Sequence, residues 1–217
     1  MSLSVNNLSI LDNHQQPLFS PVSFTVELGE VLTLMGPSGC GKSSLLSVIA
    51  GHGSADFSYQ GECYYQQQLL NNLPAEKRNI GILFQDDLLF PHLNIWENLA
   101  IALPNHVKKA QRKKQALDTL TQLDLLALAN KTPMQISGGQ RARISMMRML
   151  LAEPAVVLLD EPFSKLDKSL RSEFRNWVFL QTTNRKLPVL MVTHDADDVP
   201  SGSRCLHWPW DKETQHA

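Results

Sequence analysis

The chain has 217 residues and a formal net charge of −1; 43% of its residues are hydrophobic and 19% are charged. This composition is typical of a soluble globular protein with a sizeable core, and the small net charge gives no general attraction to nucleic acid or anionic lipid. No stretch approaches the ~18 uninterrupted apolar residues of a membrane span, and the N-terminus lacks the basic and apolar regions of a secretory signal. We therefore expect neither a membrane span nor export.

The N-terminal part alternates apolar and polar residues, most clearly over 22–28, which predicts antiparallel strands with one solvated face. Residues 31–35 form a nearly continuous apolar run, typical of a parallel strand buried on both faces. Residues 44–50 then predict a helix with an apolar side that stops at Gly51. The predicted order is strand, glycine-rich loop and helix.

Residues 36–43 of this loop read Gly-Pro-Ser-Gly-Cys-Gly-Lys-Ser, a complete phosphate-binding P-loop. In such a loop, backbone N–H groups surround the phosphates, Lys42 reaches the β/γ oxygens and the Ser43 hydroxyl binds magnesium. The following helix directs its positive end at the anion. We expect ATP to contact Gly36, Pro37, Ser38, Gly39, Cys40, Gly41, Lys42, Ser43 and Ser44.

The cysteines are odd in number and lack the spacing of a metal site, which indicates a reduced cytosolic protein. Within the P-loop, Cys40 is expected to be a small residue that fills the turn. Because it lies next to the predicted helix N-terminus, which would lower the pKa of its thiol, it could also make the site sensitive to bulky thiol reagents. The three cysteines of the chain are Cys40, Cys63 and Cys205.

A further buried strand over 80–84 ends at Gln85, and the pattern is helical from 86 to 152. Asn94 and Glu97 match a capping box at the start of a helix through Ala102, and a longer helix is predicted over 107–123. That helix carries a basic cluster, for which a solvated face and a contact with anionic lipid or a membrane partner both stay open. The cluster comprises Lys108, Lys109, Arg112, Lys113 and Lys114.

Strand and helix alternation resumes at residue 155, with a strand over 156–160, a helix over 168–184 and a strand over 189–192. The first strand delivers Asp160 to the carboxyl edge of the sheet, where it can hold magnesium. If the strand persists, Glu161 points the opposite way and can accept a proton from the attacking water. The overall pattern is an α/β lobe interrupted by an all-helical insertion.

The chain resembles the nucleotide-binding subunit of an ATP-binding cassette (ABC) transporter over nearly all its length. Residues 136–140, Ile-Ser-Gly-Gly-Gln, are similar to the family signature, and 164–167, Ser-Lys-Leu-Asp, to its D-loop. Gln85 fits the Q-loop and His194 the switch histidine. The resemblance implies a P-loop NTPase (RecA-like) lobe with an antiparallel β subdomain, formed by 1–85 and 153–217, and an inserted helical subdomain, 86–152.

The family further implies a head-to-tail dimer with two composite ATP sites. The catalytic residues would be Glu161, His194, Lys42 and Gln85, and the magnesium ligands Ser43, Gln85 and Asp160. The signature residues Ser137, Gly138, Gly139 and Gln140 would act from the other subunit across the γ-phosphate, and Asp167 belongs to the D-loop. The signature glycines precede a helix expected over 141–151, so the anion would lie at a helix N-terminus.

Residues 89–93, Leu-Phe-Pro-His-Leu, are similar to those of importer ATPases of the thiamine, iron, sulfate and polyamine group. This likeness implies a membrane permease and a periplasmic or surface substrate-binding protein as partners, and a peripheral location on the cytoplasmic face of the inner (plasma) membrane. No nucleic-acid partner is expected. Because the chain ends soon after His194, we expect no C-terminal regulatory domain.

Members of the family usually have an aromatic residue in the N-terminal strands, on which the adenine ring stacks. Residues 10–14 of this chain offer only His14, so we expect modest discrimination between ATP and GTP.

The resemblance therefore predicts the ATP-hydrolysing, energy-coupling subunit of a binding-protein-dependent importer. Three other functions remain as alternatives to it. A cassette ATPase could drive a non-importer membrane complex, such as one that extracts lipoproteins, although the His-Leu segment favours an importer. A soluble cassette protein could act on ribosomes or DNA, but such proteins usually have two cassettes or coiled-coil insertions. A regulator that binds nucleotide without hydrolysis is disfavoured by the intact Glu161 and His194.

Overall fold

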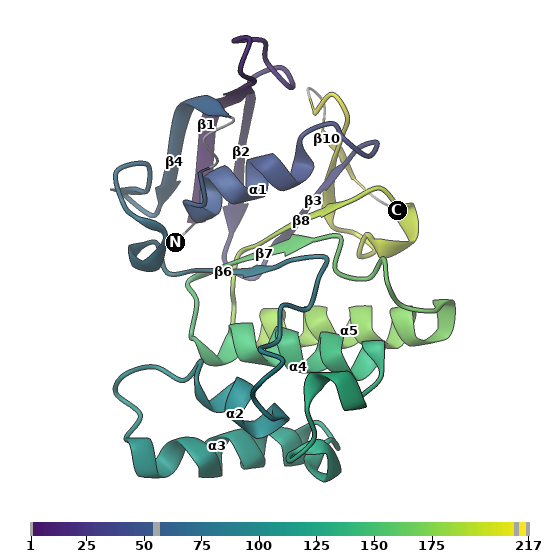
Figure 1. Cartoon of the computed structure of the whole chain (residues 1–217). Coiled ribbons are helices and arrows are strands. Elements are labelled where there is room, and N and C mark those ends of the chain that lie inside the picture. The colour runs from purple at the N-terminus through teal and green to yellow at the C-terminus, as the bar shows by residue number, and fades with distance from the viewer. Residues whose placement is uncertain (1, 54–56, 211–212, 216–217) are drawn as a thin grey trace.

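The computed structural model describes residues 2–53, 57–210 and 213–215, which form two β-sheets with helices around them (Figure 1). The smaller sheet is antiparallel, has the strand order β2-β1-β4-β5, and confirms the alternating pattern of the N-terminal part. Its strands are β1 (Ser2–Leu11), β2 (Val22–Glu27), β4 (Ser58–Tyr65) and β5 (Gln68–Leu69).

The larger sheet has the order β10-β9-β3-β8-β7-β6, and all its neighbouring strands are parallel except β10, which pairs antiparallel with β9. The carboxyl ends of the parallel strands therefore meet at one edge, where open α/β sheets bind ligands. The strands are β3 (Val31–Met35), β6 (Ile80–Leu83), β7 (Val156–Asp160), β8 (Val189–Thr193), β9 (Arg204–His207) and β10 (Glu213–Gln215).

The central strands β7 and β8 are buried on both faces along their whole length, as their continuous apolar runs predict. Val156 and Leu158 of β7 belong to a core shared with α1 (Lys42–Ala50) and the antiparallel sheet. Val157 and Leu159 belong to a second core on the opposite face, where the helices α4 and α5 lie (Figure 1). The sheet thus holds α1 and its preceding loop on one side and the helical insertion on the other.

The helical segment lies between β6 and β7 in the chain and differs from its predicted bounds only at the ends. Helix α4 begins at Gly138 rather than at Arg141, because Ser137 caps it and forms a capping box with Gln140. The helix predicted through Ala102 ends at Ala100. The helices are α2 (Ile95–Ala100), α3 (Lys109–Gln122), α4 (Gly138–Leu151) and α5 (Lys168–Asn184), and the 3₁₀ turns are η1 (Ala75–Lys77), η2 (Leu126–Leu128), η3 (Pro133–Gln135) and η4 (Ala196–Asp198).

The basic cluster on α3 is not uniformly a solvated face. The guanidinium of Arg112 donates to the backbone carbonyls of Ala100 and Leu103 at 3.0 and 2.7 Å. These hydrogen bonds connect α3 to the end of α2 and to the loop that follows it. The Lys113 ammonium lies over the Trp96 ring, 4.8 Å from its centroid. Within the described ranges, no helix is both long enough and apolar enough to cross a membrane.

Candidate active site

Chemically active side chains gather at the carboxyl edge of the parallel sheet. Strand β3 leads into the P-loop, β6 into the segment with Gln85, β7 ends at Asp160, and β8 precedes His194. A cavity of ≈ 400 Å³ opens at this edge. Its walls are Leu18, Ser38, Gly39, Gly41, Lys42, Ser43, Ser44, Phe57, Gln85, Asp160 and Glu161.

The P-loop has the backbone conformation that an anion site requires. Gly39 and Gly41 have φ angles of +83° and +96°, in the left-handed region that favours glycine. Gly41 is also the N-cap of α1, and no side chain caps that helix. The first N–H groups of α1 are therefore placed to bind phosphate oxygens, reinforced by the positive end of the helix.

Lys42 projects from the first turn of α1 and is only 5% exposed. Its ammonium donates to the carbonyl oxygens of Gly36 and Pro37 at 2.8 and 2.9 Å, and lies 3.7 Å from Oε1 of Glu161. A buried cation held by the loop itself supplies a fixed positive charge at the phosphate position.

Asp160 and Ser43 form a pair beside Lys42. The Ser43 hydroxyl donates to Oδ1 of Asp160 at 3.0 Å. The pKa of Asp160 is raised, because the effect of burial exceeds the opposite effect of this hydrogen bond. Gln85 lines the same cavity and donates from Nε2 to Oγ of Ser164 at 3.4 Å. A hydroxyl, a carboxylate and an amide are hard oxygen donors, and Mg²⁺ usually takes one or two carboxylates together with phosphate oxygens and water. The donor set fits magnesium.

Glu161 does not continue the strand. Strand β7 ends at Asp160, and Glu161 takes a left-handed backbone conformation with φ +44°. Its direction is therefore set by this turn and not by the strand alternation that the sequence predicted. The turn places its Oε1 3.1 Å from Nδ1 of His194; the side chains of Glu161 and His194 are 17% and 49% exposed. A carboxylate next to an imidazole at the cavity rim can exchange protons with a bound water.

The signature residues do not reach this cavity in the same chain. Ser137 and Gly138 are exposed at the start of α4, and none of residues 137–140 belongs to the cavity wall. Gly139 is buried, and a Cβ there would lie 2.1 Å from Cδ2 of Leu170. Asp167 caps α5 by accepting the Leu170 N–H at 3.0 Å. The N-terminus of α4 is therefore exposed at Ser137 and Gly138, where another molecule could bring an anion.

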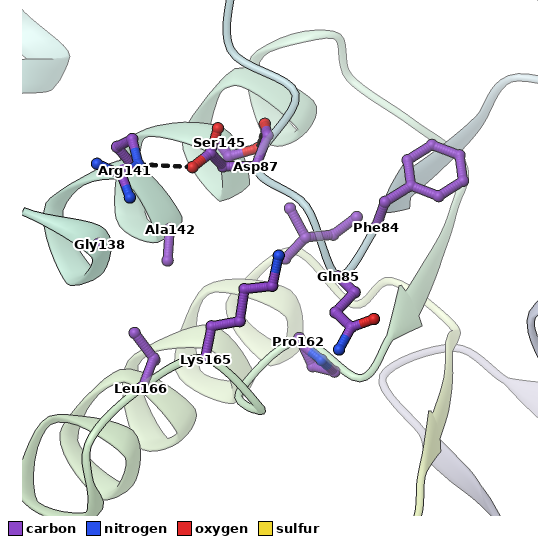
Figure 2. Close-up of a pocket in the computed structure, with 11 residues that line it drawn as sticks. Phe84, Gln85, Asp87, Gly138, Arg141, Ala142, Ser145, Pro162, Lys165 and Leu166 are labelled. Atoms are coloured by element: carbon purple, nitrogen blue, oxygen red, sulfur yellow. Dashed lines mark hydrogen bonds and ion pairs between the residues drawn. The ribbon is translucent and has the colours of Figure 1, made fainter. Parts of the chain in front are cut away.

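A second cavity of ≈ 300 Å³ lies between the Gln85 segment and α4 (Figure 2). Across it, Nε of Arg141 donates to Oδ2 of Asp87 at 2.7 Å, and the Ser145 hydroxyl donates to the Asp87 carbonyl at 2.6 Å. Lys165 forms an ion pair with Asp86 on the same segment. Since Gln85 lines both cavities, these contacts link the phosphate site to the signature helix. Sequence patterns gave no signal for the Arg141–Asp87 contact, because the partners lie far apart in the chain.

The wall of the phosphate cavity also contains Leu18 and Phe57, which the sequence did not single out. His14, the one ring found in 10–14, does not belong to this wall. Cys40 is buried against Gly36, which confirms that it is a small residue filling the turn of the loop. The lowered pKa expected for its thiol was wrong, because burial raises that pKa.

The known sequences that this chain resembles are those of ABC transporter proteins. A family model described as "ABC transporter" matches residues 19–164. The uncharacterized ABC transporter ATP-binding protein YnjD of Escherichia coli K12 is 46% identical over 204 residues, which cover 94% of each chain. The Fe(3+) ions import ATP-binding protein FbpC of Haemophilus influenzae is 38% identical over 201 residues, which cover 90% of this chain but 56% of that relative. The chain thus spans little more than half the length of this import protein.

Comparison with solved structures points the same way. The ATP-binding cassette MJ0796, determined as a dimer in a post-hydrolysis state bound to ADP and Pi, matches with a TM-score of 0.82 and 26% identity. The match covers 99% of both chains. The fold, the residues of the phosphate cavity and the similar proteins all indicate an ATP-binding cassette.

Proposed function

The chain belongs to the ABC transporter family and is an ATPase, and from this premise we propose that it is the energy-coupling subunit of a binding-protein-dependent importer. The observation that carries the proposal is the separation of the site into a phosphate cavity at the sheet edge and an exposed signature segment at the start of α4. The importer assignment draws on the likeness to FbpC, which is named an Fe(3+) import protein.

We propose that Mg²⁺ accompanies ATP and is held by Ser43, Asp160 and Gln85. When bound, Mg²⁺ neutralises charge on the β- and γ-phosphates. Lys42 binds the same oxygens, and the P-loop N–H groups hold the phosphates in line for attack. Glu161 takes a proton from the attacking water, and His194, whose Nδ1 lies 3.1 Å from Glu161, holds the γ-phosphate and that water.

A second copy of the chain would complete each site. Ser137, Gly138, Gly139 and Gln140 of one subunit would close on the γ-phosphate bound by the other. Two features support this arrangement: the start of α4 is exposed in the single chain, and MJ0796 has been solved as a dimer. ATP would then join the subunits and hydrolysis would release them, with the D-loop residue Asp167 at the shared interface.

The surface that would receive the permease lies next to the phosphate site. Leu88 and Phe90 are 54% and 41% exposed, and His92 lies beside them. Asn98 is fully buried and fixes this segment, because its side chain accepts the Phe90 N–H at 2.8 Å and donates to the Phe90 and Leu93 carbonyls. A rigid loop with exposed apolar side chains suits docking of another protein. We place 86–152 as the helical subdomain that carries this surface, and 1–85 with 153–217 as the catalytic lobe.

The proposal places the chain peripherally on the cytoplasmic face of the inner (plasma) membrane, with a permease and a substrate-binding protein in the same system and no nucleic acid. Substrate selectivity would reside in those other subunits. For the base, the proposal remains modest discrimination between ATP and GTP, with Leu18 and Phe57 as the side chains of the cavity wall that offer an apolar surface.

The proposed permease contact can be tested by affinity purification of the tagged chain from membranes of its own cells. We expect a protein with several membrane spans to be recovered with the wild type, and to be lost with Leu88→Asp because a carboxylate opposes apolar docking. Leu180→Asp is the matched control, since Leu180 is also an exposed leucine, 55% accessible, but lies on α5. Basal ATP hydrolysis of the isolated chain should be unchanged in both variants.

Recovery of ribosomes or nucleic acid in place of a membrane protein would overturn the importer proposal and favour a soluble cassette function. Recovery of a membrane complex without a substrate-binding protein would favour non-importer membrane work. Equal loss with Leu88→Asp and Leu180→Asp would show that the contact lies elsewhere.

A further inference from the structure

The start of the P-loop is tied to a segment at the far end of the described chain. This segment, Trp208-Pro209-Trp210, follows β9, which pairs with β3 in the parallel sheet. The backbone N–H of Trp208 and the indole N–H of Trp210 both donate to the carbonyl oxygen of Met35, each at 2.8 Å. Met35 is the last residue of β3 and directly precedes the P-loop. A single carbonyl at the root of the loop thus accepts two hydrogen bonds from residues 208 and 210.

Aromatic rings also pack directly against both ends of the loop. A Cβ on Gly36 would lie 3.3 Å from Cβ of Trp208, and one on Gly41 would lie 3.0 Å from the Phe19 ring. The ring centroids of Phe19 and Trp210 are 5.0 Å apart, and those of Trp208 and Trp210 are 4.9 Å apart, with steep edge-to-face angles of 66° and 89°. We call Phe19, Trp208 and Trp210 the aromatic brace.

The brace is built at a cost to the backbone. Trp210 has φ +67°, in the left-handed region that bulky residues rarely occupy, and its side chain is buried with 4% exposure. A conformation of this kind persists only where the surroundings over-determine it. Here the indole hydrogen bond and the ring contacts with Phe19 and Trp208 supply that determination.

The position of the loop's first residues matters for phosphate binding. The ammonium of Lys42 is held by the carbonyls of Gly36 and Pro37, which directly follow Met35. If the Met35 carbonyl loses a hydrogen bond, the adjacent peptides are less constrained, and the Lys42 ammonium and the loop N–H groups lose part of their fixed arrangement. Preorganised donors bind an anion better than donors that must be ordered during binding.

We propose that Trp210, through its indole N–H, is a positioning residue of the ATP site and sets the nucleotide affinity of the P-loop. Trp210 touches neither the cavity wall nor the reacting atoms; it acts through Met35 and the loop. Phe19 and Trp208 hold the indole in place. The phosphates are bound before and during hydrolysis alike, so the effect falls on nucleotide binding more than on turnover at saturation.

The test replaces Trp210 by 3-benzothienylalanine, which has sulfur in place of the indole N–H and nearly the same shape. We expect the Kd for MgATP, measured by calorimetry, to rise by roughly 3- to 10-fold, with kcat within twofold of the wild type. The loop would then have to be ordered during binding, at a cost of up to about one hydrogen bond. The same replacement at Trp208 is the matched control, because its bond to Met35 comes from the backbone N–H and is retained. Trp210→Phe provides a second variant without unnatural chemistry.

A purely structural role would lower the thermal midpoint without changing Kd or KM in the folded protein. An unchanged Kd for MgATP in both Trp210 variants would overturn the proposal, whatever their stability. An equal rise in Kd for the Trp208 and Trp210 analogues would also overturn it, because ring packing rather than the indole N–H would then be responsible.

Discussion

Glu161→Gln is expected to lower ATP hydrolysis by roughly 10²- to 10⁴-fold, the usual effect of removing a general base. Glutamine keeps the size of the side chain and its place 3.1 Å from His194 Nδ1, but it cannot take the proton of the attacking water. The variant should still bind ATP, and it should accumulate as an ATP-bound dimer because the step that separates the subunits is blocked. Phosphate release and size-exclusion chromatography with ATP measure the two effects.

Glu76→Gln is the matched control, since Glu76 is an exposed carboxylate in η1, outside the cavity wall. This variant should hydrolyse ATP and dissociate like the wild type. Near-normal turnover in Glu161→Gln would remove Glu161 from the role of base and leave His194 as the next candidate.

Lys42→Ala is expected to lose nucleotide binding and dimer formation together. The ammonium is 5% exposed and would bind phosphate oxygens both before and during hydrolysis. A hydrogen bond to a charged group contributes about 1.5–3 kcal/mol, so ATP affinity should fall by roughly 10- to 100-fold or more. Titration calorimetry with MgATP checks the affinity. Lys131→Ala, an exposed lysine on the loop after η2, should bind ATP like the wild type.

The two variants separate binding from chemistry. Glu161→Gln should gain dimer lifetime and lose turnover, whereas Lys42→Ala should lose both. If Lys42→Ala dimerised with ATP as well as Glu161→Gln, the P-loop lysine would not be the main ground-state contact to the phosphates.

The local parts of the site were predictable from sequence because their signals are local. The apolar run 31–35, the glycines at 39 and 41 and the capping box at Asn94 each dictate the conformation of their own neighbourhood. The error at the start of α4 also had a local cause: the capping box at Ser137, which was not predicted, starts the helix three residues earlier than expected.

The remaining features depend on contacts between distant residues. The direction of Glu161 follows from a turn that ends β7, and its N–H donates to the carbonyl of Val192 on the neighbouring strand at 3.0 Å. Arg112 looked like one cation of a surface cluster, but its loop carbonyls become its partners only once α2 and α3 pack together. Trp210 reaches Met35 across the sheet, a contact that no spacing in the sequence encodes.

Mixing two inactive variants tests whether each active site is shared between two copies of the chain. Lys42→Ala damages the P-loop but keeps an intact signature. Gly138→Asp damages the signature. Among the described residues only Arg141 Nη2 would lie near its Cβ, at 3.8 Å, so the substitution fits, and a carboxylate at a helix N-terminus is favourable for the helix. Across the interface, however, the same carboxylate would repel the γ-phosphate.

Each variant alone should hydrolyse ATP slowly. In the mixture, a dimer of one copy of each contains one site that pairs an intact P-loop with an intact signature. If the site is shared, ATP hydrolysis of the equimolar mixture should rise well above the sum of the separate variants. The rate should approach roughly a quarter of the wild-type rate if subunits mix at random and sites act independently. A mixture no more active than that sum, with both variants folded, would contradict a site shared between subunits.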